Sequence, residues 1–261
     1  MPARRIRIDL AYDGTDFEGF QLQPRGRTVQ GTVEAVLERL AGGRLVRLRA
    51  ASRTDSGVHA RKQVVDARID TSLDDAALEH GLEALLPCDV RATRVATVPD
   101  TFHSMHHALA KTYRYVLDLS RHGDPLSARY AVRHRGPFDV QPVERGLRLL
   151  VGRRDFSGFA DSRCRVRERV RRLDRAEWVP DGDARGFFVF RADGFLTYMV
   201  RNMVGTLLEI ARGKRPVESI AEILETRDRR LAAATAPARG LCLWDVEYPS
   251  EGPVDVPPVR H

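Results

Sequence analysis

Apolar and polar positions alternate at the start of the chain, which predicts a strand there. Ile6, Ile8 and Leu10 fall on one face, and the residues between them are charged. Apolar residues then recur at helical spacing over 29–40, and Thr28 is placed to cap that helix. The chain therefore opens with a strand, a loop and a helix.

The patterns continue in the same style. They predict a helix over 73–86 that Pro87 stops, and a strand over 113–117 with alternating faces. The stretch 122–142 carries Gly, Pro and Arg without clear periodicity. We expect the boundary between two halves of the chain there.

The second half also shows the patterns of helices and strands. It predicts helices over 141–151, 196–207 and after Pro216, and strands around Trp178, 187–190 and 241–246. No sequence repeat is visible. These parts predict an α+β fold of two similar mixed-sheet halves, with helices packed on the sheets and a basic cleft between the halves. The expected division is 1–120, 121–248 and a Pro-rich tail at 249–261.

Composition places the chain among folded globular proteins. It has 261 residues, of which 43% are hydrophobic and 30% charged. No apolar run approaches the roughly 18 residues of a membrane span, and the N-terminal residues lack the apolar stretch of a secretion signal. We therefore expect a cytoplasmic protein without a membrane partner. The three cysteines are widely spaced, so we expect buried thiols rather than disulfides or a zinc site.

The charge balance favours a nucleic-acid partner. The net charge is +7, with 40 arginines and only three lysines. Arginine is a good fork for phosphate and a good plane for stacking on bases. A genome biased towards GC would explain the same arginine excess, so both interpretations stay open.

The run 53–60 (R-T-D-S-G-V-H-A) is the strongest candidate for chemistry. It sets the carboxylate of Asp55 on a tight loop, with Arg53 two residues before it and Gly57 two residues after it. A carboxylate there can act as a nucleophile, a general base or a metal ligand. On spacing alone, an Asp that only hydrogen-bonds its own turn fits better.

The run 53–60 resembles the R-T-D-A-G-V-H-A signature of the TruA family of tRNA pseudouridine synthases. Further motifs that are similar to the family's lie in the same order along the chain. Before the run 53–60 come Y-D-G at 12–14 and G-F-Q at 19–21. After it come F-H at 102–103 with K-T-Y-R-Y at 111–115, D-F-S at 155–157 and M-V-R-N-M-V-G at 199–205. These matches span nearly the whole chain.

The resemblance implies a fold, an activity and a partner. The implied fold is that of pseudouridine synthases. The implied activity is the isomerisation of uridine at positions 38 to 40 in the anticodon stem-loop of tRNA. It also implies that the enzyme works as a homodimer, without a cofactor or metal. Asp55 would be the catalytic nucleophile: the C–N glycosidic bond breaks, the uracil turns in the site, and it is rejoined through C5.

Four further residues are predicted to bind the substrate, Tyr113 and Arg201 from the resemblance, and Arg53 and Asn202 from their positions beside Asp55 and Arg201. Tyr113 would stack on or hydrogen-bond the flipped uridine, and Arg201 would pair with Asp55 and keep it ionised. Arg53 would hold a phosphate or fill the vacated stack. Asn202, the only asparagine of the chain, would make a specific hydrogen bond. The alternatives are a core role for Tyr113 and a surface position for Arg201.

The chain departs from the family pattern at four positions. Ser52 replaces the usual Gly, Ser56 an Ala, and Phe20 a Trp, which are small or aromatic-for-aromatic changes. Met105 stands where an Arg commonly follows the F-H motif. Because this loss weakens an expected RNA contact, Met105 is not among the predicted site residues.

Two clusters suggest other functions. His103 and His107 have the spacing of a helical metal pair, and His106 lies beside them, but no nearby Asp, Glu or Cys completes a site. The basic residues Arg163, Arg165, Arg167, Arg169, Arg171 and Arg172 alternate as in a strand, either as a solvated edge or as a contact for the tRNA backbone.

The alternative to catalysis is a non-catalytic RNA-binding protein on the same scaffold. A metal-dependent nuclease that uses Asp55 is disfavoured, because such chemistry normally needs several clustered carboxylates.

Overall fold

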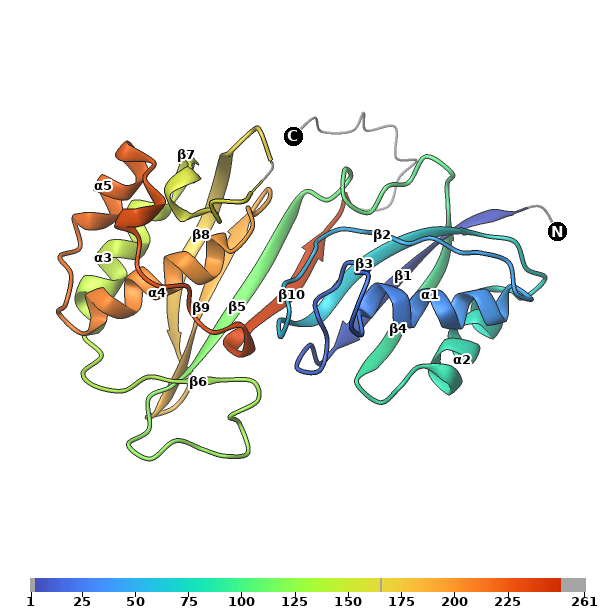
Figure 1. Cartoon of the computed structure of the whole chain (residues 1–261), viewed down its shortest axis with the longest axis horizontal. Coiled ribbons are helices and arrows are strands. Elements are labelled where there is room, and N and C mark those ends of the chain that lie inside the picture. The colour runs from blue at the N-terminus through green and yellow to red at the C-terminus, as the bar shows by residue number, and fades with distance from the viewer. Residues whose placement is uncertain (1–2, 165, 250–261) are drawn as a thin grey trace. The chain divides into compact units, whose positions relative to one another are not determined.

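The computed structural model describes residues 3–164 and 166–249 (Figure 1). This part of the chain holds ten strands and five α-helices, which confirms the predicted mixed α+β class. It divides into two compact units. The first contains the described residues up to Leu109 and those from Leu243, and the second is Ala110–Cys242.

Part of a sheet, with β1 inside it, forms the centre of the first unit. Its strand order is β4 (Val90–Val98), β1 (Arg4–Tyr12), β3 (His59–Ile69) and β10 (Leu241–Glu247), and the short β2 (Arg49–Ala50) pairs with β3. Strand β1 is antiparallel to both β3 and β4. The chain therefore returns to this unit for its last strand.

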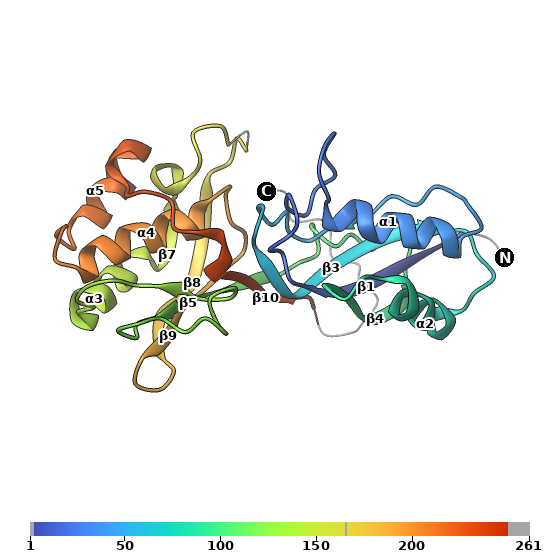
Figure 2. The ribbon, with the colours of Figure 1, turned by 60° about the horizontal axis from the view of Figure 1, so that its bottom comes forward.

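Two helices pack on these strands, α1 (Val29–Leu40) and α2 (Asp75–Leu85) (Figures 1 and 2). Thr28 caps α1 as predicted, because its hydroxyl accepts the N–H of Gly31 at 3.2 Å. Helix α2 begins later than predicted because Asp74 caps it and accepts the N–H of Ala77 at 2.8 Å. The helices cover the apolar side chains of β1, which are fully buried.

The ten strands form one sheet rather than the two predicted, and four of its strands form the centre of the second unit. These four follow the order β5 (Ala110–Asp118), β9 (Arg185–Ala192), β8 (Val170–Pro180) and β7 (Gly152–Asp155). These neighbours are antiparallel, whereas the short β6 (Val132–Arg133) runs parallel to β5. The sheet is therefore mixed, as predicted.

Three helices accompany these strands of the second unit: α3 (Val140–Leu150), α4 (Met199–Ala211) and α5 (Ser219–Thr226) (Figure 1). Three short 3₁₀ helices lie at Ser157–Phe159, Arg229–Leu231 and Ala238–Gly240. Helix α4 is the most deeply buried, with an apolar stripe as predicted. Its Gly205 is needed for packing, because a Cβ there would lie 2.1 Å from the carbonyl oxygen of Ala234.

The two units differ from the predicted halves 1–120 and 121–248. All of β5 belongs to the second unit, because it pairs with β9, and most of β10 belongs to the first. The predicted tail 249–261 lies outside the described residues except for Pro249.

The arginine run is not the predicted strand. Of the described arginines in this run, Arg171 and Arg172 lie in β8, and residues 161–164 and 166–169 form no strand. Arg163 pairs with Asp161 at 3.2 Å, and Arg169 donates to the carbonyl oxygen of Cys164 at 3.0 Å. The arginines alternate along the sequence, but their local polar contacts take the place of strand pairing. Arg165 lies outside the described residues.

Two further expectations concern the cysteines and the membrane. Cys164 is buried and Cys242 half-buried, but Cys88 is exposed, so the expectation of three buried thiols is wrong for Cys88. None of the helices in the described chain is long and apolar enough to cross a membrane.

Candidate active site

The loop that carries Asp55 is tied to the sheet of the first unit through Gln63 on β3. The Gln63 side chain accepts the N–H of Ser52 at 3.2 Å and donates to its carbonyl oxygen at 2.6 Å. The hydroxyls of Tyr12 and Thr54 lie 2.7 Å apart. Gln63 and Tyr12 are buried, so the loop leaves the sheet from a fixed base.

The segment between β1 and α1 braces the same loop from the other side. Phe20 donates its N–H to the carbonyl oxygen of Thr54 at 3.0 Å. The carbonyl oxygen of Phe17 accepts the N–H of Gly57 at 3.3 Å and the hydroxyl of Ser56 at 3.1 Å. The motifs at 12–21 and 53–60 therefore form one structural unit.

Glycines allow the two segments to come this close. A Cβ on Gly14 would lie 2.0 Å from the carbonyl oxygen of Val58, which no side chain tolerates. Gly19 has a φ of +97°, and Gly57, at the turn after Asp55, has a φ of +75°. The predicted tight loop is thus confirmed, with glycine where the backbone requires it.

Asp55 itself lies at the turn. Its carbonyl oxygen accepts the N–H of Val58 at 3.1 Å, and the residue is half-buried. A carboxylate that is held on a braced turn and keeps contact with solvent can meet a substrate without a large rearrangement.

A cavity of about 320 Å³ opens in the first unit. Its lining combines two guanidinium groups, two amides, imidazoles and apolar groups, from Phe20, Gln21, Gln30, Leu48, Arg49, Ala50, Arg53, His103, Met105 and His106. The G-F-Q, R-T-D and F-H motifs all contribute residues. Cations beside flat and amide side chains suit a nucleotide, since they meet both a phosphate and a base.

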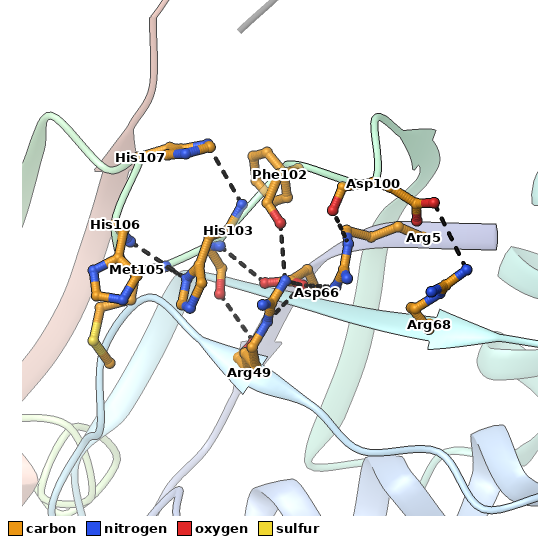
Figure 3. Close-up of polar contacts among 11 residues, drawn as sticks. Arg5, Arg49, Asp66, Arg68, Asp100, Phe102, His103, Met105, His106 and His107 are labelled. Carbon is orange, nitrogen blue, oxygen red and sulfur yellow. Dashed lines mark hydrogen bonds and ion pairs between the residues drawn. The ribbon is translucent and has the colours of Figure 1, made fainter. Parts of the chain in front are cut away.

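Asp66 on β3 holds Arg49, one of the residues that line this cavity (Figure 3). Its fully buried carboxylate accepts Arg5 at 2.7 Å and Nε of Arg49 at 3.0 Å, and its second oxygen accepts the N–H of Ser104 at 2.9 Å. Arg49 also donates to the carbonyl oxygen of Phe102 at 2.9 Å. This network fixes both Arg49 and the segment 102–107.

The histidines of that segment are joined to it by backbone contacts (Figure 3). Nδ1 of His103 accepts the N–H groups of Met105 at 3.2 Å and His106 at 3.4 Å. Burial, together with the nearby positive charge of Arg49, lowers the pKa of His103 from 6.5 to about 4. The described residues contain no group of three or more His, Cys, Asp or Glu that could hold a metal ion.

In the second unit, Tyr113 lies on β5 and is 5% exposed. Its ring meets the ring of Phe195 edge-on, with centroids 5.0 Å apart. The phenol is therefore held in one orientation.

Arg201 lies on α4 and is half-buried. Its Nε donates to the carbonyl oxygen of Ala236 at 2.8 Å, and its guanidinium lies 4.8 Å above the ring of Tyr198. Arg201 is thus anchored to its own unit, unlike an arginine that only snorkels to the surface.

The prediction that Asn202 binds substrate needs correction. Asn202 is 0% exposed, and its amide donates to the carbonyl oxygen of Phe159 at 2.7 Å. Its Oδ1 accepts Arg229 at 2.9 Å and Thr235 at 2.7 Å. Because protein atoms surround the amide, Asn202 supports the fold around α4 and is not placed to touch substrate.

Three residues that the sequence did not single out hold the site together: Arg49, Gln63 and Asp66. A polar residue among the apolar neighbours of a buried strand was the available signal for Gln63 and Asp66. Asp55 and Arg53 lie in the first unit, whereas Tyr113, Arg201 and Asn202 lie in the second. The Asp55–Arg201 pair and the cleft between the halves stay predictions.

Comparison with known proteins identifies the class of enzyme. The family model for tRNA pseudouridine synthase matches residues 10–106 and 147–249. The chain belongs to this family, which forms pseudouridine by isomerising uridine in tRNA. A solved structure, of the archaeal box H/ACA sRNP Nop10-Cbf5 complex, aligns over 86% of this chain and 59% of that chain. At 10% identity and a TM-score of 0.34, this alignment supports no conclusion.

Within the family, curated relatives share one name, tRNA pseudouridine synthase A. The protein from Bordetella petrii is 44% identical over 95% of this chain and 92% of its own length. Those from Geobacillus kaustophilus and Geobacillus sp. strain WCH70 are 42% and 39% identical. The match covers 95% of this chain and 96% of the relative in the first case, and 94% and 99% in the second. The TruA resemblance is thereby confirmed.

Proposed function

We propose that this protein converts uridine to pseudouridine at positions 38 to 40 in the anticodon stem-loop of tRNA, with Asp55 as the nucleophile. The observation that carries the proposal is the braced loop, which presents a half-buried carboxylate on a turn held by two other family motifs. The target positions follow from the TruA resemblance. No cofactor takes part in the proposed reaction.

The chemistry follows from the residue types. The target uridine leaves the base stack, and the Asp55 carboxylate attacks it while the C–N glycosidic bond breaks. The uracil turns, a bond forms between C5 and the sugar, and the bond to Asp55 breaks, which returns the free carboxylate. The proton on C5 is lost to solvent, and N1 takes up a proton. A dry site would raise the pKa of the carboxyl, so a positive partner is required, and we assign Arg201 to that role. Tyr113 offers an aromatic face to the flipped base.

Tritium release tests the proposal. Transfer RNA labelled at uridine C5 loses tritium to water only when the C5–H bond breaks. We expect release by the parent and none by Asp55→Asn, which keeps the shape of the side chain but is not a nucleophile. Asp55→Asn should still bind tRNA. Asp100→Asn, at an exposed position of the same unit, is the matched control and should retain the parent rate.

The same assay separates the alternatives when EDTA is present. Tritium release with intact tRNA supports isomerisation. Strand cleavage that disappears with EDTA would indicate the nuclease, and tRNA binding without either product would indicate a non-catalytic binder. Clear product formation by Asp55→Asn would remove Asp55 from the mechanism.

The assignment of Arg201 has its own test. Arg201→Ala should reduce activity strongly at neutral pH, with partial recovery as the pH rises and Asp55 ionises again. Arg201→Lys keeps the charge but not the fork, so we expect an intermediate rate. Parent-like activity of Arg201→Ala would show that the residue only anchors α4 through Ala236.

We also propose that the protein is a homodimer and acts in the cytoplasm, where tRNA is modified. The TruA resemblance supports the dimer. Light scattering of the purified protein should give twice the chain mass of 29.4 kDa. Cell fractionation should recover the activity with soluble tRNA.

A further inference from the structure

Lys111 is a largely buried residue whose ammonium group has no partner within the described chain. Lys111 lies on β5 and is 9% exposed, and no hydrogen bond or ion pair to it is seen among residues 3–164 and 166–249. A buried unpaired cation is costly, and proteins normally pair it. Burial lowers the pKa of Lys111 to about 8, with repulsion from Arg171 acting in the same direction and Asp193 in the opposite one.

Arg171 on β8 brings a second cation to the same place. It is 7% exposed, and its Nη1 donates to the carbonyl oxygens of Glu168 at 2.9 Å and Val170 at 2.7 Å. In the described chain its Nε and Nη2 donate to nothing, and no carboxylate forms an ion pair with it. The guanidinium therefore retains unused donors.

The Arg171 side chain has space beside Gly194, and little negative charge lies near it. A Cβ on Gly194 would lie 3.3 Å from the Arg171 Nε, so a glycine lets the guanidinium pass close to the backbone. The nearby Asp193 uses Oδ1 to accept the N–H of Arg172 at 3.0 Å. Among the described residues, Asp193 is thus the one nearby carboxylate for the two cations Lys111 and Arg171, and one of its oxygens already accepts a hydrogen bond.

Sheet register places both cations on the face that carries Tyr113. Ala192 on β9 lies opposite Lys111 on one side and opposite Leu173 of β8 on the other. Arg171 is two residues from Leu173, and Tyr113 is two residues from Lys111. Since alternate residues of a strand share a face, Lys111, Arg171 and Tyr113 do so too.

The unpaired nitrogens of Lys111 and Arg171 keep some contact with solvent although both residues are largely buried. In the described chain, the buried side-chain nitrogens and oxygens that lack a hydrogen-bond partner are Nε of Arg114 and Nε of Arg133. Nζ of Lys111 and the unused nitrogens of Arg171 are not among them. These nitrogens therefore lack a partner in the described chain and still touch solvent, so they can donate to a ligand.

We propose that Lys111 and Arg171 form an anion subsite beside Tyr113 that binds a backbone phosphate of the RNA next to the flipped uridine. This inference rests on the proposed function, which supplies the RNA. A phosphate provides the negative charge that the two cations lack, and it accepts from a lysine point charge and an arginine fork together. The subsite would hold the nucleotide by its backbone while Tyr113 contacts the base.

The salt dependence of tRNA binding tests the subsite. The variants are Lys111→Met, which removes the charge, Lys111→Arg, which keeps it, and Lys214→Met as a control at an exposed lysine of the same unit. All are measured in the Asp55→Asn background, so binding is separated from turnover. We expect Lys111→Met to lower the slope of log affinity against log salt by about 0.7 to 0.9, one phosphate contact. Lys111→Arg and Lys214→Met should keep the parent slope.

Two further readouts keep the test decisive. Because Lys111 loses its proton above a pH of about 8, parent affinity should fall from pH 7 to 9.5 relative to Lys111→Arg, which stays charged. The melting temperature of free Lys111→Met should equal or exceed that of the parent, since an unpaired buried charge is gone.

An unchanged salt slope for a folded Lys111→Met would overturn the subsite. If Lys111→Met does not fold, equal pH profiles of the parent and Lys111→Arg would overturn it. The proposed function fails separately, if the parent binds tRNA but releases no tritium.

Discussion

Polar residues inside family motifs do two different jobs in this protein. Asn202, in the M-V-R-N motif, uses its whole side chain to bind Phe159, Arg229 and Thr235. Asp55, in the R-T-D motif, lies half-buried on a turn that other residues brace. Their burial separates a residue that supports the fold from one that is available to a ligand.

Removing the Asn202 amide should therefore destabilise the protein. Asn202→Ala leaves the Phe159 carbonyl and the Arg229 guanidinium short of a partner inside the fold. At about 1 to 3 kcal/mol for each of these two groups, we expect a loss of about 2 to 6 kcal/mol in the free energy of unfolding. Urea unfolding measures it, with Gln141→Ala at an exposed position as the control. A stable Asn202→Ala that lacks tRNA affinity would restore the substrate-binding role.

His103 should make stability depend on pH in a defined window. Its pKa is lowered to about 4 in the folded state from 6.5, so the unfolded chain binds the proton more readily between these values. The contribution of neutral His103 is complete above pH 6.5 and is lost as the pH falls towards 4. His103→Asn offers an oxygen acceptor without titrating.

We expect His103→Asn to lose less stability than the parent between pH 6.5 and 4. Urea unfolding at several pH values gives both curves, and their difference removes the titration of the carboxylates. Parallel curves would contradict the burial of a neutral imidazole.

At the scale of elements, the spacing of apolar residues predicted those helices and strands whose ranges depend on the local sequence. The ranges of α1, α3 and β5 agree closely with the predicted 29–40, 141–151 and 113–117. Strand β4 was missed because its register shifts against β1 between Asp9 and Leu10, which breaks the alternation of apolar residues. The predicted strand in the arginine run failed because bonds from its side chains to nearby acids and carbonyls compete with pairing.

The braced loop gives a prediction at this scale. Gly14→Ala pushes a methyl group against the carbonyl oxygen of Val58 and should displace the Asp55 turn by a few tenths of an ångström to about 1 Å. A shift of that size lowers kcat/KM by about 100-fold. Tritium release measures the effect, and Thr15→Ala, next to it on the exposed side of the segment, should stay near the parent rate. Full activity of Gly14→Ala would show that the loop tolerates movement.

At the scale of the whole molecule, motif matches predicted the family, but not the contacts that hold the site. Gln63 and Ser52, or Asp66 and Ser104, meet only because the sheet brings distant segments together. The periodicity of apolar residues along the sequence does not predict such pairs. The cation excess is also a property of the whole chain, and its use depends on which arginines have carboxylate partners.

The arginines between β7 and β8 should therefore differ in their effect on tRNA binding from those within β8. Arg167 is exposed and forms no ion pair within the described chain, whereas Arg172 pairs with Asp174 at 2.9 Å. Arg167→Gln should lower the slope of log affinity against log salt by about 0.7 to 0.9 for the phosphate that Arg167 neutralises in the parent. The matched change Arg172→Gln should alter it less. Equal slopes for all three proteins would identify this segment as a solvated edge.

The position of β10 has a consequence for synthesis on the ribosome. The second unit is a continuous piece of chain, but the first needs β10, whose Asp245 pairs with Lys62 at 2.6 Å and whose Trp244 lies under Arg61. That strand is translated only after the second unit. Until β10 is made, β3 of the nascent first unit therefore lacks its neighbouring strand, and its edge stays unpaired while the second unit is translated. We expect the emergence of β10 from the ribosome, rather than translation of residue 109, to mark the moment when the Asp55 loop gains its protection from proteases.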